Sequence, residues 1–454
     1  MLMDRDQAHN FESLEREIST RSIESLASDT EFAGRFASTV SNYFGQSVQD
    51  LFAARRYLTV AAKYVAVMHG NVAAQGLLLE QLDRGLSGDV VAITSLQVSR
   101  RLKDYDRGSE YLREIYYRSS KSPYIGYFLG ESLVSSGDLV GFRRFALSVL
   151  EDASTKKFGD REVLRWANLL ADAGEASIAL EFAGLATASE ETVFLRERIN
   201  SLLSGAHSAV PIRIINLLHE DRKWRIGSSS LTRAGYKNVQ RHIAVAGSAL
   251  PDALVAGIIA SEVATRLLGK GATACWLSHW SVWEEIADDS SSGVGLVLED
   301  DALPFTGAEY LDRIIEATTD FDLVWVNDRM SSIAHGEHVT WGLSLLDPWE
   351  QLRSWPGSRQ GWGADAYLLT RQGAQKLLAM AEQDGIQNHV DGQVGAFSTA
   401  IRSEPLNGIQ RRIETMQRGM SLPAERMKAT SVNVPAFRAR PFGVSSTVTV
   451  GRDS

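Results

Sequence analysis

Three consecutive carboxylates, Glu299, Asp300 and Asp301, follow the short apolar run Val294–Leu298. Such a run predicts a buried strand of a mostly parallel sheet, and open α/β sheets bind their ligands at the carboxyl ends of such strands. Adjacent carboxylates repel one another unless a cation is present, and oxygen ligands of this kind suit Mg²⁺ or Mn²⁺. The segment therefore predicts metal-assisted handling of a nucleotide diphosphate. The alternative is a strand that ends in a solvated acidic turn.

Length and composition limit the class of protein. The chain has 454 residues, of which 44% are hydrophobic and 23% charged, as in a folded protein of two or three domains. Its net charge of -9 argues against a general nucleic-acid-binding role, which needs a basic surface. The only cysteine, Cys275, excludes an intrachain disulfide framework and a cysteine-rich zinc site. Without a recognisable secretory signal or bilayer-spanning run, we expect a cytoplasmic protein, peripheral membrane association being left open.

The first part of the chain, residues 1–205, has the periodicity of helices, since apolar residues recur there at spacings of three and four. A turn-like unit repeats within it, with equivalent positions at Gly70, Asp104, Gly137 and Gly174. The intervals between these positions are 34, 33 and 37 residues. That period predicts stacked helix-turn-helix repeats that resemble tetratricopeptide units and bind a partner or the acceptor. An irregular helical bundle is the alternative.

The pattern changes after Pro211, and residues 211–407 alternate between strand-like and helical segments. We expect strands at Ile212–Leu217, Arg241–Ala246, Gly295–Leu298, Phe321–Val326 and Ala364–Leu369, and helices at Asp252–Leu268, Ala274–Ala287, Glu309–Thr318 and Arg371–Glu382. This alternation predicts an α/β domain with a doubly wound, mostly parallel sheet. Residues 408–454 are basic, and we expect an irregular tail whose charges cover the diphosphate or the acceptor.

Four landmarks in this second part occur in a characteristic order. They are Ile215–Leu217 with the charged segment Glu220–Arg225, then Arg241–Gly247 and Gly271–Trp283, then Leu298–Ala302, and finally Ala366–Leu378 leading to His389–Asp391. Their order resembles glycosyltransferase family 25, the bacterial lipopolysaccharide-type galactosyltransferases related to the collagen-modifying enzymes of animals. The most specific part is Cys-x-x-Ser-His followed about twenty residues later by Leu-Glu-Asp-Asp-Ala. Ala246 stands where the family usually has an aspartate.

The resemblance implies a GT-A-type fold and a UDP-sugar donor. It implies inverting transfer of a hexose, with galactose the specific candidate, to a glycan, lipid-linked saccharide or protein. A cation, Mn²⁺ or Mg²⁺, would bridge the diphosphate to Asp300 and Asp301, with Glu299 as a sugar or structural contact. A rival hypothesis keeps the fold without catalysis: a scaffold whose helical repeats bind partners and whose α/β half is degenerate, a reading that Ala246 favours and the clustered acids oppose.

The candidates for catalysis are Asp391 as the base that deprotonates the acceptor, Asp365 as the second choice, and His279. For Asp391 the alternative is a helix cap or a salt bridge. On the predicted helix, His279 lies four residues from Cys275 and from Trp283, so it could equally be a hydrogen-bonded core histidine. A metal site made by Cys275 and His279 is not expected, because no further ligands follow at suitable spacing.

The candidates for donor binding are Asn216, Ser278 and a basic residue of the charged segment. Which of Arg222, Lys223 and Arg225 contacts the diphosphate stays open, and Asn216 could read the nucleotide or cap a turn. A cluster of tryptophans before the last landmark could form an acceptor lid or simply pack an irregular loop. Its members are Trp341, Trp349, Trp355 and Trp362.

Overall fold

A computed structural model of the chain describes most of its residues. They are 13–14, 16–18, 21, 25–26, 28–44, 51–155, 158–258, 268–335, 339–352, 363–400, 408–420 and 426–439. The described residues form two compact units, one that ends at Phe158 and one that begins at Gly159. The predicted boundary at residue 205 follows the change of element type instead, since the first strand, β1, is Ile212–Asn216. The second unit therefore includes helices of the predicted helical part.

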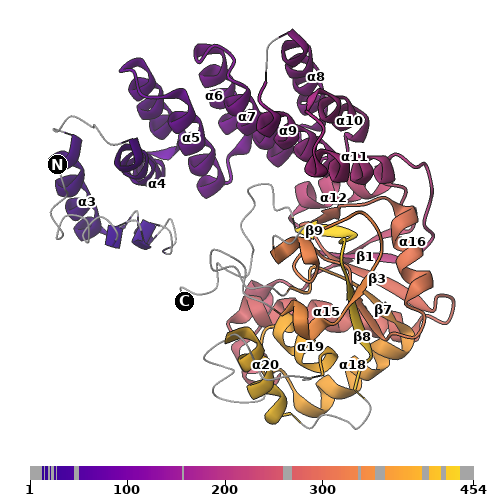
Figure 1. The fold of residues 1–454 in the computed structure, drawn as a ribbon. Helices are drawn as coiled ribbons and strands as arrows, with labels where there is room; N and C mark the ends of the chain where they lie inside the picture. The colour runs from indigo at the N-terminus through magenta and orange to yellow at the C-terminus, as the bar shows by residue number, and fades with distance from the viewer. Residues whose placement is uncertain are drawn as a thin grey trace. The chain divides into compact units, whose positions relative to one another are not determined.

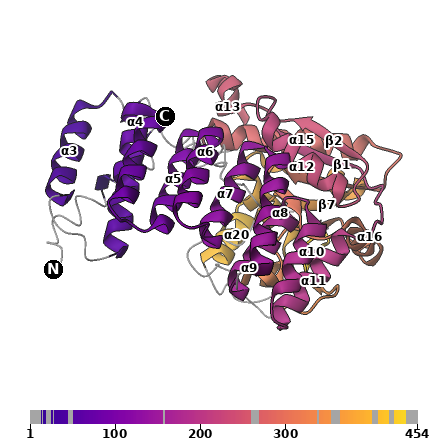
Figure 2. The same ribbon diagram turned by 90° about the horizontal axis from the view of Figure 1, so that it is seen from above.

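The first unit is helical, as predicted. Its helices are α3 (Thr30–Phe44), α4 (Leu51–Asp83), α5 (Gly88–Leu102), α6 (Tyr105–Arg118), α7 (Pro123–Ser136) and α8 (Leu139–Thr155). From α4 to α8 each helix packs against the next one along the chain (Figures 1 and 2). Lys103 and Gly137 have positive φ values of 54° and 82° and end α5 and α7, while Gly70, with a φ of 84°, kinks the chain within α4. The recurring turns are thus real, and a tetratricopeptide identity stays a prediction.

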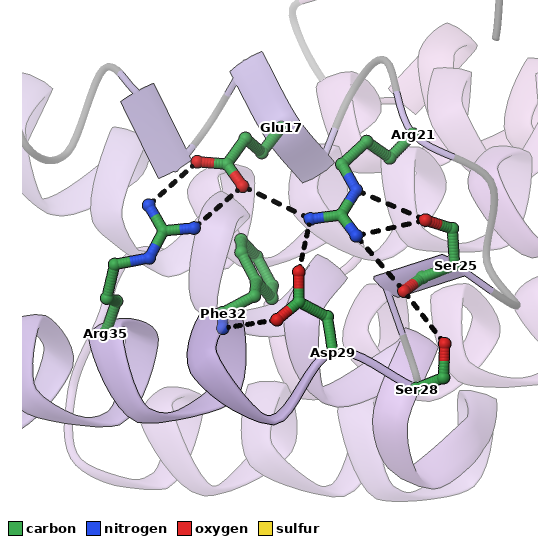
Figure 3. Close-up of polar contacts among 7 residues, drawn as sticks. All are labelled: Glu17, Arg21, Ser25, Ser28, Asp29, Phe32 and Arg35. Carbon is green, nitrogen blue, oxygen red and sulfur yellow. Dashed lines mark hydrogen bonds and ion pairs between the residues drawn. The ribbon is translucent and has the colours of Figure 1, made fainter.

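Polar contacts tie the residues before α3 to that helix (Figure 3). The Arg35 guanidinium donates to both oxygens of Glu17 over 2.9 and 3.0 Å, and Arg21 Nη1 donates to Asp29 Oδ2 over 2.8 Å. Asp29 Oδ1 accepts from the Phe32 amide over 2.8 Å and so satisfies a free N–H at the start of α3. Exposed ion pairs contribute at most about 1 kcal/mol each. The buried apolar cluster beneath them, which includes Leu14, Ile18, Leu26, Phe32 and Phe36, does more of the stabilising.

The second unit contains a sheet whose described strands have the order β2-β1-β3-β7-β5-β8-β6. These are β2 (Val239–Ile243), β1, β3 (Val294–Glu299), β7 (Ala366–Thr370), β5 (Leu323–Trp325), β8 (Ala429–Val432) and β6 (Leu345–Leu346). The pairings make β1, β2, β3, β5 and β8 parallel, while β7 and β6 run the opposite way. The predicted α/β class with a mostly parallel sheet is confirmed, and the antiparallel β7 makes the sheet mixed.

Helices cover both faces of this sheet (Figure 1). The described helices of the second unit are α9 (Asp160–Asp172), α10 (Ala176–Leu185), α11 (Glu190–Leu202), α12 (Asp221–Arg233), α13 (Asp252–Ile258), α15 (Lys270–Asp288), α16 (Ala308–Ala317), α17 (Pro348–Gln351), α18 (Arg371–Asp384), α19 (Val390–Ser398) and α20 (Gly408–Arg418). Helices α9, α10 and α11 pack on one another, and α11 contacts α16. Val297 and Tyr367 share one buried cluster with residues of α15, α18 and α19. Val324 and Leu368 point to the opposite face, where Ile315 of α16 lies. Of the predicted helix Asp252–Leu268, the part after Ile258 lies largely outside the described residues.

The segment after residue 407 differs from the expected irregular tail. Residues 408–420 and 426–439 form α20, β8 and β9 (Phe437–Ala439), and β8 lies in the sheet between β5 and β6. Strand β9 pairs with β4 (Ala302–Pro304). The physical reason is apolar burial, since Ile409, Ile413 and Val432 are at most 2% exposed. Arg440 lies outside the described residues, so a cover over the ligand made by the last basic residues stays untested.

Two of the four tryptophans pack into the protein. Trp349 is fully buried, and the Trp341 ring packs against the rings of Phe194 and Tyr310 at 5.7 and 5.6 Å between centroids. Trp355 and Trp362 lie outside the described residues. None of the helices in the described part of the chain combines the length and the apolar character that a bilayer crossing needs.

Candidate active site

Four strands bring the predicted acidic residues to one edge of the sheet. Strands β1 and β3 are parallel, with Ile215 opposite Glu299, so Asn216 ends beside the acidic run. Strand β7 runs the other way, and the residue before it, Asp365, uses its carbonyl to accept from the Glu299 amide over 2.9 Å. Strand β5 ends beside β7, which places Asn327 next to Asp365. The strand-end rule used on the sequence therefore predicts which of these residues lie together in the fold.

Asp300 is the acid that the protein itself satisfies. Lys223 Nζ donates to Asp300 Oδ1 over 2.9 Å, and Asn216 Nδ2 donates to Asp300 Oδ2 over 2.8 Å. Arg241 Nε in turn donates to Asn216 Oδ1 over 2.8 Å. Burial opposes the charge of Lys223, but the charge of Asp300 and its hydrogen bond, with a smaller effect of Asp301, raise the pKa of the ammonium group. Lys223, one of the three basic candidates, therefore contacts the acidic run directly.

Asp301 and Asp365 each have a buried oxygen without a hydrogen-bond partner among the described residues, Oδ1 in Asp301 and Oδ2 in Asp365. Burial and the neighbouring Asp300 raise the pKa of the Asp301 carboxyl. Burial also raises the pKa of Asp365 to about 8, although Arg329 opposes the rise. Buried carboxylates without donors are unfavourable unless a proton or a cation compensates them. Binding of a proton or a cation at these two oxygens is therefore favourable.

Arg329 lies among the carboxylates of this end of the sheet, and the sequence analysis did not predict its role. We call this end the acidic edge; its carboxylates are those of Glu299, Asp300, Asp301, Asp365 and Asp391. Its Nε lies 3.8 Å from Asp365 Oδ1. The charge of Asp365 raises the pKa of Arg329 the most, against the effect of burial, and Asp391, Asp301 and Glu299 add to the rise. The polar run Asn327–Arg329 follows a predicted strand, as the acidic run does. That strand-end rule was the available signal.

Gly363 makes room for this arginine. A Cβ atom at that position would lie 2.5 Å from Arg329 Nη1 and 2.5 Å from Asp365 Oδ1. Asn327 Nδ2 donates to the Gly363 carbonyl over 2.6 Å and to Asp365 Oδ1 over 3.2 Å, which fixes the approach of the two segments. The absence of a side chain at Gly363 is therefore part of the site.

Glu299 is partly exposed, at 32%, and contacts α15 from the sheet. Its Oε1 lies 3.4 Å from His279 Nε2 and 4.0 Å from the Cys275 sulfur. Burial raises the pKa of Glu299 to about 8, and the charges of Asp391 and Asp301 add to this effect. The three ligand atoms of Cys275, His279 and Glu299 lie within 4.8 Å of one another, a grouping that spacing along the chain did not indicate.

His279 is completely buried between α15 and β7. Its Nδ1 lies 2.9 Å from the Tyr367 hydroxyl, which also accepts a hydrogen bond of 2.7 Å from Trp283 Nε1. Burial lowers the pKa of His279 to about 4, so the ring is neutral at neutral pH. His279 is thus a buried, hydrogen-bonded core histidine that also contacts Glu299 of the acidic run.

Asp391 lies in the first turn of α19, where His389 occupies the N-cap position. Its Oδ1 accepts from the Ala364 amide over 3.2 Å, and its charge raises the pKa of both Glu299 and Arg329. The structure therefore brings Asp391 to the same edge as the acidic run, and its role as the base stays a prediction.

The remaining candidates for donor binding are Arg222, Arg225 and Ser278. Arg225 is exposed and Arg222 half-buried on α12. Ser278 is buried, and its hydroxyl donates to the Ala274 carbonyl over 2.7 Å and accepts from the Val245 amide over 2.9 Å. These bonds attach the loop after β2 to α15. The hydroxyl of Ser278 thus serves the packing of this loop rather than a contact with the acids.

The residues present fit a divalent cation. The edge carries Glu299, Asp301, Asp365 and Asp391 against the single charge of Arg329, while Lys223 balances Asp300. Carboxylate oxygens are the donors that Mg²⁺ and Mn²⁺ take, and the unpartnered oxygens of Asp301 and Asp365 are available to such an ion.

Residues 210–391 match the family model described as glycosyltransferase family 25 (LPS biosynthesis protein). The matched stretch runs from the start of β1 to Asp391, so it contains all of the acidic edge. The predicted resemblance is thereby confirmed, and it supports glycosyltransferase activity. The α/β part of this chain is similar to the glycosyltransferases of family 25.

Proposed function

We propose that the protein is a metal-dependent glycosyltransferase of cell-surface glycan biosynthesis. It transfers a hexose, with galactose the specific candidate, from a UDP-sugar to a hydroxyl group of a saccharide or another acceptor. The observation that carries the proposal is the excess of carboxylates at the acidic edge, where Asp301 Oδ1 and Asp365 Oδ2 are buried and have no hydrogen-bond donor in the described part of the chain. Both residues lie within the stretch that matches a glycosyltransferase family.

Asp301 is the first choice to hold the cation, with Asp365 and Asp300 beside it. A bound divalent cation stabilises the departing nucleotide diphosphate as a Lewis acid. Lys223 and Asn216 each donate to one oxygen of Asp300, so they fix that carboxylate beside the cation site. Arg329 keeps the surrounding carboxylates together and adds positive charge beside the leaving group.

The acceptor hydroxyl is activated by Asp391. Its carboxylate takes the hydroxyl proton as the acceptor oxygen bonds to the anomeric carbon of the sugar. The bond between that carbon and the diphosphate oxygen breaks, and its electron pair leaves with UDP. Because attack and departure occur on opposite faces, the transfer inverts the anomeric centre without a covalent intermediate. The Ala364 amide, which donates to Asp391 Oδ1, keeps the base oriented.

Thermal stability tests this proposal, because a ligand that binds only the folded state raises the melting temperature. The probes are UDP, UDP-galactose, UDP-glucose and UDP-N-acetylglucosamine, each with and without Mn²⁺. We expect an Mn²⁺-dependent rise with one UDP-sugar that Asp301→Asn abolishes. Asp320→Asn is the matched control, since it makes the same change at an exposed aspartate on the loop after α16. Equal behaviour of Asp301→Asn and wild type would exclude the proposed cation site, and no response to any donor would favour a scaffold.

A further inference from the structure

Four side chains form a continuous contact chain from the core to the acidic edge. Trp283 Nε1 donates to the Tyr367 hydroxyl over 2.7 Å, and that hydroxyl lies 2.9 Å from His279 Nδ1. On the other side of the ring, His279 Nε2 lies 3.4 Å from Glu299 Oε1. Trp283, Tyr367 and His279 are all completely buried. Helix α15 supplies two of these groups, β7 one and β3 one, so the chain links three elements of the fold.

Counting protons gives this chain a direction. The indole of Trp283 can only donate, so the Tyr367 oxygen accepts from it. The one proton of the Tyr367 hydroxyl then finds an acceptor in His279 Nδ1, and the neutral ring carries its own proton on Nε2, facing Glu299. In the opposite arrangement, Nδ1 would donate to Tyr367, and the tyrosine proton would have no acceptor among the described contacts. A buried hydroxyl without a partner is unfavourable, so the first arrangement prevails.

Cys275 strengthens the same orientation of Glu299. It lies one turn before His279 on α15, and its sulfur is 4.0 Å from the same oxygen, Glu299 Oε1. Two donors of α15 therefore hold one oxygen of the carboxylate. The Glu299 side chain nevertheless keeps 32% of its surface exposed, so the carboxylate is held from one side and open on the other.

We propose that Trp283, Tyr367 and His279 are positioning residues that present Glu299 as a hydrogen-bond acceptor for a hydroxyl group of the donor sugar. The inference rests on the proposed function, because it assumes a UDP-sugar at this edge. Only Glu299 touches the sugar, while the other three fix its direction. A cation bound at Asp301 would favour the ionised form of the neighbouring acids, and the ionised Glu299 accepts a charge-assisted hydrogen bond from a sugar hydroxyl. It therefore reads the sugar and leaves the UDP part of the donor to other residues.

A metal ion on Cys275, His279 and Glu299 is the competing use of the same atoms. Zinc binds thiolate, imidazole and carboxylate together. The hydrogen bonds of His279 oppose metal binding, because Nδ1 accepts the tyrosine proton and Nε2 carries the ring proton. Binding at Nε2 would require the proton to move to Nδ1, which would leave the Tyr367 proton without an acceptor. The hydrogen-bond chain and the metal site are thus mutually exclusive.

Nitrogen NMR tests the direction of the chain without any sugar. Protein labelled with ¹⁵N-histidine should show one ring, absent from His279→Gln, that carries its proton on Nε2. In Tyr367→Phe this ring should lose the single tautomer, because Nδ1 has lost its donor. A proton on Nδ1 in the wild-type protein would overturn the proposal. A shift of the His279 signals on addition of one equivalent of Zn²⁺ would replace it with the metal site.

Donor affinity tests what the chain does. The quantity measured is the ratio of the Kd for UDP to the Kd for the preferred UDP-sugar, by calorimetry with Mn²⁺. Glu299→Gln should lower this ratio about tenfold or more and leave the Kd for UDP unchanged, as expected for loss of a hydrogen bond to a charged group. Tyr367→Phe should lower the ratio in the same direction by a smaller factor.

Tyr310→Phe is the matched control, because its buried hydroxyl also makes hydrogen bonds, at 3.0 and 3.3 Å to the Gly342 and Val434 carbonyls, but it does not join this chain. It should leave the ratio unchanged. If Tyr310→Phe and Tyr367→Phe behave alike, the positioning role is wrong. If wild-type protein binds neither UDP nor any UDP-sugar, the proposed function fails, and the NMR experiment still decides the direction of the chain.

Discussion

The two sides of the acidic edge differ although they start from adjacent residues. On the paired side, Asp300 accepts hydrogen bonds from Lys223 and Asn216. On the side that we call unpaired, Asp301 Oδ1 and Asp365 Oδ2 are buried and accept no hydrogen bond from the described residues, although Arg329 lies beside the other oxygen of Asp365. The difference teaches that a run of acids is not one functional unit. Lys223 neutralises the paired carboxylate within the protein, whereas the unpaired carboxylates carry negative charge that a bound cation would neutralise.

Asp301→Asn should produce the largest effect, a fall in transfer rate of about a hundredfold to a thousandfold, which corresponds to about 3–4 kcal/mol of lost transition-state stabilisation. The folded protein without metal should be as stable as wild type or more so, because the change removes an unpaired buried charge. Kinetics with Mn²⁺ and unfolding in EDTA measure the two quantities. A stability loss equal to that of a paired-side variant would erase the comparison.

Lys223→Met should give the opposite pattern. It leaves Asp300 buried without its cation, so the free energy of unfolding should fall by about 3 kcal/mol, as for a broken buried ion pair. Urea unfolding measures this loss. Arg225→Met is the control, because it removes a basic side chain that is exposed on the same helix, and it should change the stability by less than about 0.5 kcal/mol.

Gly363→Ala should disturb the unpaired side by a smaller amount. The added Cβ would meet both Arg329 and Asp365, so one of them must move. The free energy of unfolding should fall by about 1–3 kcal/mol, as in an overpacked core. The change in transfer rate should exceed that of Gly257→Ala, where a Cβ meets nothing within 4 Å. Equal rates for the two variants would mean that Arg329 does not organise the site.

The pH dependence of stability should show the smallest effect. The pKa values of Glu299 and Asp365 rise on folding to about 8, so these groups bind more protons in the folded state than in the unfolded state. Their contribution to stability is therefore lost as the pH rises through 8. In EDTA we expect the melting temperature to fall by a few degrees between about pH 6.5 and 8.5. His279 adds nothing in this window, because its lowered pKa destabilises the protein only below about pH 6.5.

Mn²⁺ should abolish this decline, since a bound cation favours the ionised carboxylates. Asp365→Asn should weaken it even in EDTA. A decline that persists unchanged in Asp365→Asn would show that other groups cause it.

Local patterns predicted the elements well, for physical reasons that particular segments illustrate. The apolar run before Glu299 became β3, and the helix predicted at Ala274–Ala287 became α15 with similar ends. Periodicity succeeds there because the buried face of each element is written in its own residues. The order of the strands could not be read in this way. Strand β8 is short and contains Thr430 and Ser431, so its place between β5 and β6 depends on partners far along the chain.

The site was predicted in part for the same reason. Strand ends identified Glu299, Asp300, Asp301 and Asn216, which the parallel pairing of β1 and β3 brings together. Arg329 was missed, because the carboxylates that surround it belong to other segments of the chain and not to its neighbours in sequence. The division between Asp300 and Asp301 was also beyond the sequence, since it depends on the reach of Lys223 from α12.

The strands β8 and β9, which come last among the described strands, affect how the protein folds during its own synthesis. Strand β8 lies beside β5, and the Ala439 amide donates over 3.3 Å to Asp328 Oδ1, next to Arg329. On the ribosome, the N-terminal helices can fold as they emerge, because their contacts are local. The acidic edge must wait until residue 439 has left the exit tunnel. A nascent chain that lacks this segment therefore has an incomplete acidic edge, and chaperones would meet an open sheet edge at β5 until β8 pairs with it.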